Sequence, residues 1–94
     1  MAFARGWVAY LLRCGDRSLY AGVTNDLRAR VAAHRGKLGP RGAKYTRSRG
    51  PFRMVWRQEA ADKVEACRIE YRLKRLTRRA KLALVRTRGR VALP

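Results

Sequence analysis

Two short apolar stretches near the start of the chain are separated by residues typical of a turn. The stretch from Trp7 to Arg13 is rich in aromatic and aliphatic residues, and the second stretch runs from Leu19 to Val23. The residues between them, 14–18, read Cys-Gly-Asp-Arg-Ser. Glycine tolerates positive φ, and Asp and Ser side chains bond to the nearby backbone. This pattern predicts two strands joined as a β-hairpin.

The next segment has the signals of a helix. Thr24, Asn25 and Asp26 offer side-chain oxygens that can accept a hydrogen bond from an unpaired backbone N–H. We predict a helix from about Asn25 to Arg35 that stops at Gly36. Leu27 and Val31 lie one turn apart and are predicted to face the core.

A basic segment without periodicity follows this helix. Residues 37–51 combine glycines, prolines and basic side chains, and the segment is longer than an ordinary connection. From Phe52 to Arg57, apolar and basic residues alternate, which predicts a third strand with one buried face.

The last third of the chain is predicted to form two helices and a tail. Asp62 and Glu65 have the spacing of a capping box, and the helix that they start is expected to reach about Leu76. Thr77 can cap a last helix that runs through Arg86, and residues 87–94 are expected to form a frayed, flexible tail. The positions predicted to face the core are Val64, Cys67, Tyr71 and Leu73 in the first helix and Leu82 and Val85 in the second.

The predicted order of elements is therefore β-β-α-β-α-α. A hairpin and a third strand with helices outside them form a small α+β (mixed α/β) layer fold. We find no internal repeat and no domain boundary, so the 94 residues are expected to form a single domain with its core over about residues 7–86.

The charge of the chain indicates the class of its partner. Lys and Arg number 24 and Asp and Glu number 6, which gives a formal net charge of +18. Such a surplus attracts a polyanion, and the guanidinium group of Arg matches phosphate oxygens bidentately. Nucleic acid is the predicted partner; a basic surface without a partner and an anionic membrane surface are the alternatives.

No apolar run approaches the roughly 18 residues that a membrane span needs. Trp7 to Leu12 is a poor secretory signal, because it is short and Arg13 follows it directly. Cys14 and Cys67 lie far apart without metal-ligand spacing, so we expect free thiols and a cytoplasmic protein.

Two short motifs and two further residues carry a resemblance to a known family. Val8-Ala9-Tyr10 followed by Tyr20-Ala21-Gly22 resembles the two sequence signatures of the GIY-YIG nuclease domain, with the family's ten-residue spacing between tyrosines. Arg30 lies ten residues beyond Tyr20, where the family has its catalytic arginine, and His34 follows where many members have His or Tyr. The resemblance extends from about residue 7 to residue 85 and is strongest to the stand-alone bacterial, YhbQ-like group. It implies a GIY-YIG endonuclease-like fold with a three-stranded antiparallel sheet.

The resemblance also implies a function, which is that of a metal-dependent DNA endonuclease serving DNA repair or the turnover of damaged or branched DNA. Tyr10 and Tyr20 would surround the attacking water, and nearby cations would favour the phenolate form that can deprotonate it. Arg30 would clamp the scissile phosphate, and His34 would orient it or protonate the leaving group. Glu70 would hold one Mg²⁺ or Mn²⁺ ion, which commonly uses a single protein carboxylate and keeps several waters.

Glu65 is the second choice for the metal ligand, because its capping role makes it less available. The basic segment supplies further candidates for nucleic-acid contacts, in which an aromatic ring stacks on a base and cations follow the phosphates. These candidates are Lys37, Arg41, Lys44, Tyr45, Arg47 and Arg49.

The sequence also departs from the family pattern. Val8 and Ala9 replace the glycine and the aliphatic residue of the first signature, and Val23 stands where some members have lysine. Many members have a supporting asparagine in the C-terminal part, but the one asparagine of this chain is Asn25, and Leu82 lies near the expected place. Two alternatives therefore stay open: a non-catalytic DNA- or RNA-binding module on the same fold, and a ribosome- or RNA-associated basic protein.

Overall fold

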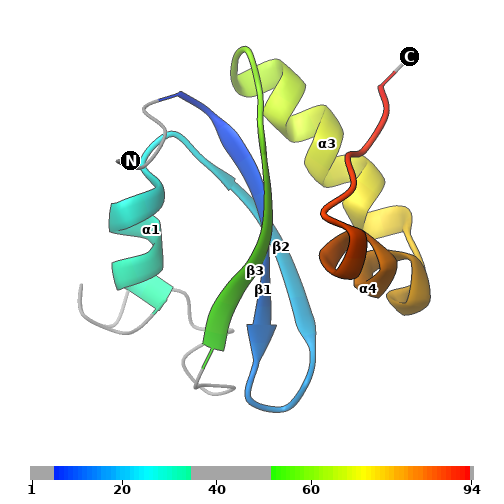
Figure 1. The fold of residues 1–94 in the computed structure, drawn as a ribbon. Coiled ribbons are helices and arrows are strands. Elements are labelled where there is room, and N and C mark those ends of the chain that lie inside the picture. The colour runs from blue at the N-terminus through cyan, green and yellow to red at the C-terminus, as the bar shows by residue number, and fades with distance from the viewer. Residues whose placement is uncertain (1–5, 35–51, 94) are drawn as a thin grey trace.

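The computed structural model of the protein describes residues 6–34 and 52–93. Three antiparallel strands, β1 (Val8–Cys14), β2 (Leu19–Thr24) and β3 (Phe52–Glu59), form a sheet in the order β2-β1-β3. The first strand of the chain is thus the central one (Figure 1). The predicted three-stranded antiparallel sheet is confirmed, although β3 extends two residues further than the alternation predicted.

The turn between β1 and β2 uses the polar residues that predicted it. The Ser18 backbone N–H and hydroxyl both donate to Asp16 Oδ1, at 3.0 and 2.6 Å. Backbone bonds from Cys14 N to Ser18 O and from Arg17 N to Cys14 O, both 2.9 Å, close the turn. Arg17, with φ of 71°, takes the left-handed conformation.

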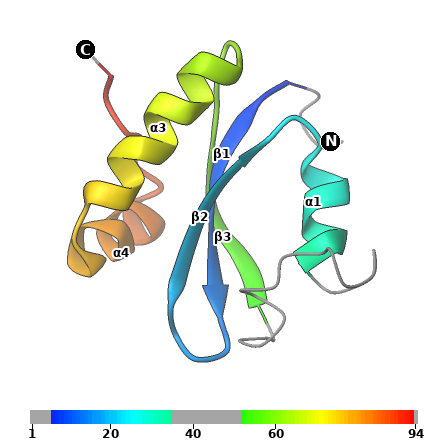
Figure 2. The same ribbon diagram turned by 180° about the vertical axis from the view of Figure 1, so that it is seen from behind.

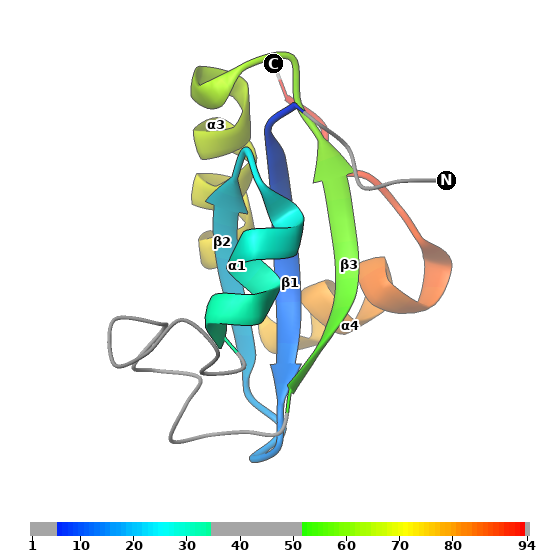
Figure 3. The same cartoon turned by 90° about the vertical axis from the view of Figure 1, so that its left-hand side faces the viewer.

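In the described part of the chain, three helices cover the two faces of the sheet, and side chains cap each start. Helix α1 (Leu27–His34) lies on one face, whereas α3 (Lys63–Arg75) and α4 (Arg78–Thr87) lie on the other (Figures 2 and 3). Oxygens of Asp26, Asp62 and Thr77 accept hydrogen bonds from backbone N–H groups in the first turns of α1, α3 and α4. Glu65 also reaches back, and its Oε1 accepts from Ala61 N at 2.8 Å, one residue before the cap.

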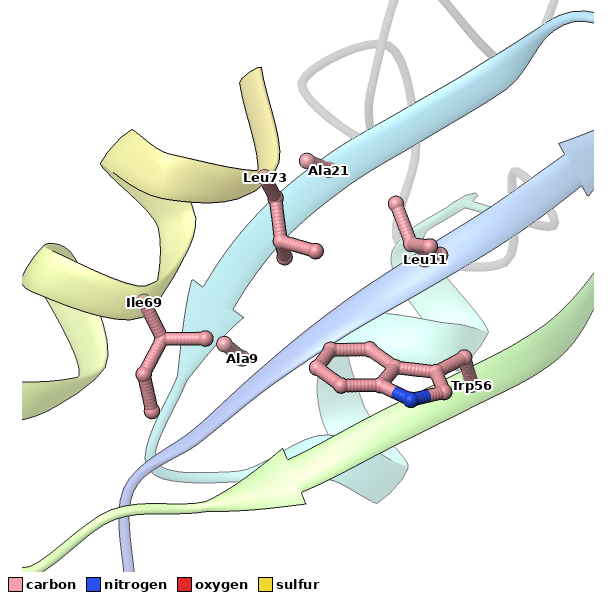
Figure 4. Packing of buried hydrophobic residues seen from close by; sticks show 6 residues of the cluster. All are labelled: Ala9, Leu11, Ala21, Trp56, Ile69 and Leu73. Carbon is pink, nitrogen blue, oxygen red and sulfur yellow. The ribbon is translucent and has the colours of Figure 1, made fainter. Parts of the chain in front are cut away.

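The alternation of side chains along β1 builds a core on each face of the sheet. Val8, Tyr10 and Leu12 pack with Leu27 under α1. On the opposite face, Ala9 and Leu11 pack against residues of β2, β3 and α3. Figure 4 shows this second cluster, which consists of Ala9, Leu11, Ala21, Trp56, Ile69 and Leu73.

The core face of α3 differs from the predicted one. Val64 and Tyr71 were expected to be buried, but they are 61% and 63% exposed. Cys67 is half-buried, and only Leu73 of the expected set is fully buried. The helix instead buries Ala66, Ile69 and Leu73. Two apolar stripes run along this helix. The sheet contacts the stripe that begins with Ala66 and not the predicted stripe that begins with the larger Val64.

The last helix and the tail also differ from expectation. No residue of α4 is fully buried; Leu82 and Val85 are half-buried, and Val85 packs on the core together with Leu84. The tail that we expected to be frayed is held against β3 by side chains of that strand. Trp56 Nε1 donates to Gly89 O at 2.9 Å, and Val91 and Leu93 pack against the core.

Gln58 adds a pair of hydrogen bonds to the tail. Its Nε2 donates to Val91 O at 3.2 Å, and its Oε1 accepts from Val91 N at 2.7 Å. One side chain thus pairs both backbone polar groups of a tail residue, as a neighbouring strand would.

Candidate active site

Tyr10 lies at the middle of the central strand and points towards the α1 face. It is 2% exposed, and its partner across the sheet is Gly22 of β2. A Cβ atom added to Gly22 would lie 2.5 Å from the Tyr10 hydroxyl oxygen and 2.7 Å from its Cζ. The phenol therefore lies across the glycine, in space that any side chain at position 22 would fill.

Tyr20 and Arg30 reach the same face of the sheet. Tyr20 lies two residues before Gly22 on β2, so it projects to the same side. It is half-buried and packs against the cluster that contains Tyr10. Arg30 comes from α1, is exposed, and its charge acts on the Tyr10 hydroxyl.

Glu70 approaches from the opposite side, on α3. This helix packs against β2 and β1, and β2 is an edge strand, so α1 and α3 flank the same edge from opposite faces (Figure 3). The Glu70 side chain is 23% exposed and forms an ion pair with Lys74 Nζ at 3.4 Å. Its charge also acts on Tyr10.

Burial raises the pKa of the Tyr10 hydroxyl well above its ordinary value of 10.0. The charges of Tyr20 and Glu70 raise this pKa further, and Arg30 lowers it. We expected nearby cations to favour the phenolate, but desolvation is the larger effect. Tyr10 therefore keeps its proton at neutral pH and can donate a hydrogen bond.

Three predicted residues, Tyr20, Arg30 and Glu70, thus come within electrostatic reach of the hydroxyl of the fourth, Tyr10. His34 is the last residue of α1, one turn after Arg30, and the structure describes only its backbone. The six candidates of the basic segment lie outside the described residues. They are Lys37, Arg41, Lys44, Tyr45, Arg47 and Arg49.

Lys74 forms an ion pair with Glu70 and was not among the predicted site residues. It neutralises Glu70 from one turn further along α3. The spacing of four residues between an acid and a base on a helix could have revealed this pair.

The donor set around Glu70 suits one kind of metal ion. Among the described residues, no group of three or more His, Cys, Asp or Glu side chains could enclose an ion. Mg²⁺ is commonly bound through one or two carboxylates and otherwise by water and substrate phosphates. A single, partly exposed carboxylate therefore fits Mg²⁺ or Mn²⁺ and not an ion that needs a protein cage.

Comparison with known families identifies the family of the chain. The GIY-YIG catalytic domain matches residues 6–83. The chain belongs to the GIY-YIG family.

Within the described residues, no helix is long and apolar enough to cross a membrane.

Several bacterial proteins are similar to this GIY-YIG chain over most of their length. A UPF0213 protein of Oceanobacillus iheyensis is 49% identical over 77 residues, covering 81% of this chain and 85% of the relative. A UPF0213 protein of Clostridium perfringens is 46% identical over 80 residues, covering 85% and 83%.

A solved structure shares the fold. The solution NMR structure of a UPF0213 protein from Bacillus halodurans superposes with a TM-score of 0.56 at 44% identity, covering 88% of this chain and 85% of that one. GIY-YIG membership points to nuclease-type chemistry on nucleic acid, and nucleases of this family generally use a divalent metal ion.

Proposed function

We propose that this protein is a metal-dependent endonuclease that hydrolyses phosphodiester bonds in DNA, in repair or in the turnover of damaged or branched DNA. The observation that supports this proposal is that Tyr20, Arg30 and Glu70 all act electrostatically on the buried hydroxyl of Tyr10. Those three groups come from β2, α1 and α3, so packing of the whole fold is needed to bring them together.

Each side chain has a role in this proposal. Arg30, exposed and permanently charged, clamps the scissile phosphate and stabilises the charge that develops there. Tyr10 stays protonated and donates a hydrogen bond, which fixes the position of its acceptor. Tyr20 is less buried, so water can reach it. We therefore assign it to contact the attacking water. His34 is assigned to the leaving oxygen, to which it gives a proton.

Glu70 would hold one Mg²⁺ or Mn²⁺ ion. Such an ion, when bound, supplies positive charge beside the scissile phosphate. Lys74 already neutralises the Glu70 carboxylate, so binding of an ion there requires that the pair separate. The 3.4 Å ion pair has one well-exposed partner, and such pairs are weak in water.

The test is cleavage of labelled single-stranded, duplex and branched DNA with Mg²⁺ or Mn²⁺. Glu70→Ala is expected to abolish cutting and to leave affinity nearly unchanged, whereas Arg30→Ala should lower the rate roughly 100-fold or more. The matched controls are Glu59→Ala and Arg79→Ala, which remove an exposed acid and an exposed base outside the site and should cut normally.

The same assay separates the two alternatives. Binding without cutting under every metal condition would contradict the enzymatic proposal and favour a non-catalytic module on this fold. Preference for RNA and co-sedimentation with ribosomes would favour an RNA-associated protein. Cutting that survives Glu70→Ala would contradict the choice of metal ligand.

A further inference from the structure

A groove runs along the outer face of α3, beside the C-terminal segment. It encloses about 940 Å³ and is lined by residues of α3 and by Leu76 and Leu93. Figure 3 shows the segment after α4 passing β3 and approaching α3 near its end, and Leu93 of this segment lines the groove. None of the residues proposed for cleavage lines this groove, so it is a separate site.

The groove has an apolar floor and a basic rim. Val64 and Tyr71 are more than half exposed there, and Cys67 is half-buried between them. These side chains are not needed for the core, which α3 contacts with Ala66, Ile69 and Leu73. The charged lining residues are all cations, namely Lys63, Arg68, Arg72 and Arg75. The ligand of such a surface must carry negative charge and apolar area together.

Tyr71 is held in place by one of these cations. The guanidinium carbon of Arg75 lies 5.4 Å from the centre of the Tyr71 ring, and Arg75 Nη1 donates to the Tyr71 hydroxyl at 3.1 Å. An aromatic ring fixed on one side by a cation offers its other side for stacking. A flat, uncharged group such as a nucleobase fits that side.

We propose that this groove binds single-stranded nucleic acid, with a base stacked on Tyr71 and phosphates along the row of arginines. Arg68, Arg72 and Arg75 follow one another at helical spacing, with about 6 Å of rise between the first two. A row of guanidinium groups beside an exposed aromatic ring is the usual combination in proteins that bind single strands. Because a net charge of +18 draws in polyanions generally, nucleic acid is favoured over an acidic peptide.

The proposal deepens the proposed function, on which its choice of ligand rests, by naming a substrate class. Glu70 and Tyr71 are consecutive, so the groove and the cleavage site lie on adjacent stripes of the same helix. An unpaired strand that leaves the cleavage site can pass over α3 into the groove. The protein would then select DNA in which a duplex is joined to a single-stranded segment.

Cys67 allows the groove to be tested directly. Its thiol lines the groove and is half-buried, whereas the thiol of Cys14 is buried in the core. Oligothymidylate at saturating concentration is expected to slow alkylation of Cys67 by a maleimide several-fold, as measured by mass spectrometry of the full chain. Tyr71→Ala should weaken the affinity for fluorescein-labelled oligothymidylate by about 5- to 150-fold, the effect of one stacked base.

Two variants control this experiment. Tyr71→Trp keeps a stacking surface and should bind as the wild type does, and Arg86→Ala removes an exposed cation outside the groove and should change affinity little. Cys67 that is alkylated at the same rate with and without the oligonucleotide would overturn the proposal. Protection by a glutamate-rich peptide but not by the oligonucleotide would also overturn it and assign the groove to an acidic protein partner.

The outcomes separate this proposal from the nuclease proposal. Glu70→Ala should stop cleavage and keep the protection of Cys67. Protection without any cleavage would support the groove alone. Cleavage without protection would support the nuclease and overturn the groove.

Discussion

At the scale of single residues, the position of Tyr10 depends on the missing side chain of Gly22. The hydroxyl end of a tyrosine usually moves aside easily, but this one is buried among Val8, Leu12 and Leu27. The ring therefore has little freedom to yield to a new neighbour. The site therefore requires glycine at position 22 so that Tyr10 can pack there. The second family signature contains this glycine but does not by itself give that reason.

Gly22→Ala is expected to destabilise the protein by about 1–3 kcal/mol, the usual cost of overpacking. Its Cβ would meet the Tyr10 ring at 2.5–2.7 Å, so the ring must shift, and cleavage should fall with it. Urea unfolding and the cleavage assay measure the two effects. Gly6→Ala is the matched control, because its Cβ would meet nothing nearer than Ala60 O at 4.0 Å. Equal stability of the two variants would contradict this reading of the contact.

The candidate residues could be chosen from the sequence, but the ionisation of Tyr10 could not be predicted from it. The offsets from Tyr10 to Tyr20 and from Tyr20 to Arg30 are local, so they survive any uncertainty about the rest of the fold. The pKa of Tyr10 depends on burial, which comes from residues far away in the sequence. Counting nearby cations gave the wrong sign, because it leaves out desolvation.

At the scale of elements, the caps of the helices could be predicted and the core face of α3 could not. The side chains of Asp62 and Thr77 accept hydrogen bonds from backbone N–H groups three residues later, so their capping role can be predicted from the local sequence. The sequence of α3 offers two apolar stripes, and nothing local says which of them meets the sheet. Val64 and Tyr71 have large side chains, so we predicted that their stripe faces the core, but both residues are exposed.

The docking of the tail was also hidden from sequence reasoning. The bonds from Trp56 and Gln58 join residues 33 positions apart, and no local pattern marks them. A glutamine in a strand that otherwise alternates apolar and basic residues gives no sign of its partner. Such contacts become visible only when the fold places β3 beside the tail.

Gln58→Leu is expected to cost about 1–3 kcal/mol, because both Val91 backbone groups lose their partner. The loss should be concentrated in the tail, so the Val91 amide should exchange hydrogen faster than the amides of β1. Hydrogen exchange followed by NMR measures this directly. Arg57→Leu, an exposed neighbour on the same strand, is the control and should leave the tail protected. Unchanged exchange at Val91 in Gln58→Leu would contradict the anchoring role.

At the scale of the whole molecule, the net charge of +18 opposes folding while it favours binding. Compaction brings like charges together, and salt screens their repulsion. The same salt weakens contacts with a polyanion. Stability and affinity should therefore respond to salt in opposite directions.

Raising the salt concentration is expected to raise the melting temperature and to lower the affinity for nucleic acid in the same buffers. Each 1 kcal/mol of relieved repulsion corresponds to roughly 4–8 °C for a domain of this size. Thermal unfolding followed by circular dichroism, together with fluorescence anisotropy of a labelled oligonucleotide, measures both. A melting temperature that falls as salt rises would show that attractive charge pairs outweigh the repulsion.

The order of the strands has a consequence for the synthesis of the protein. β1 is translated first but lies at the centre of the sheet, and its second neighbour, β3, is translated only after β2, α1 and residues 35–51. While these are made, one edge of β1 has no partner, and the strand is apolar on both faces. Unpaired apolar edges are templates for association between nascent chains. The time the ribosome spends on residues 25–59 is therefore part of the period in which each new chain is exposed to aggregation.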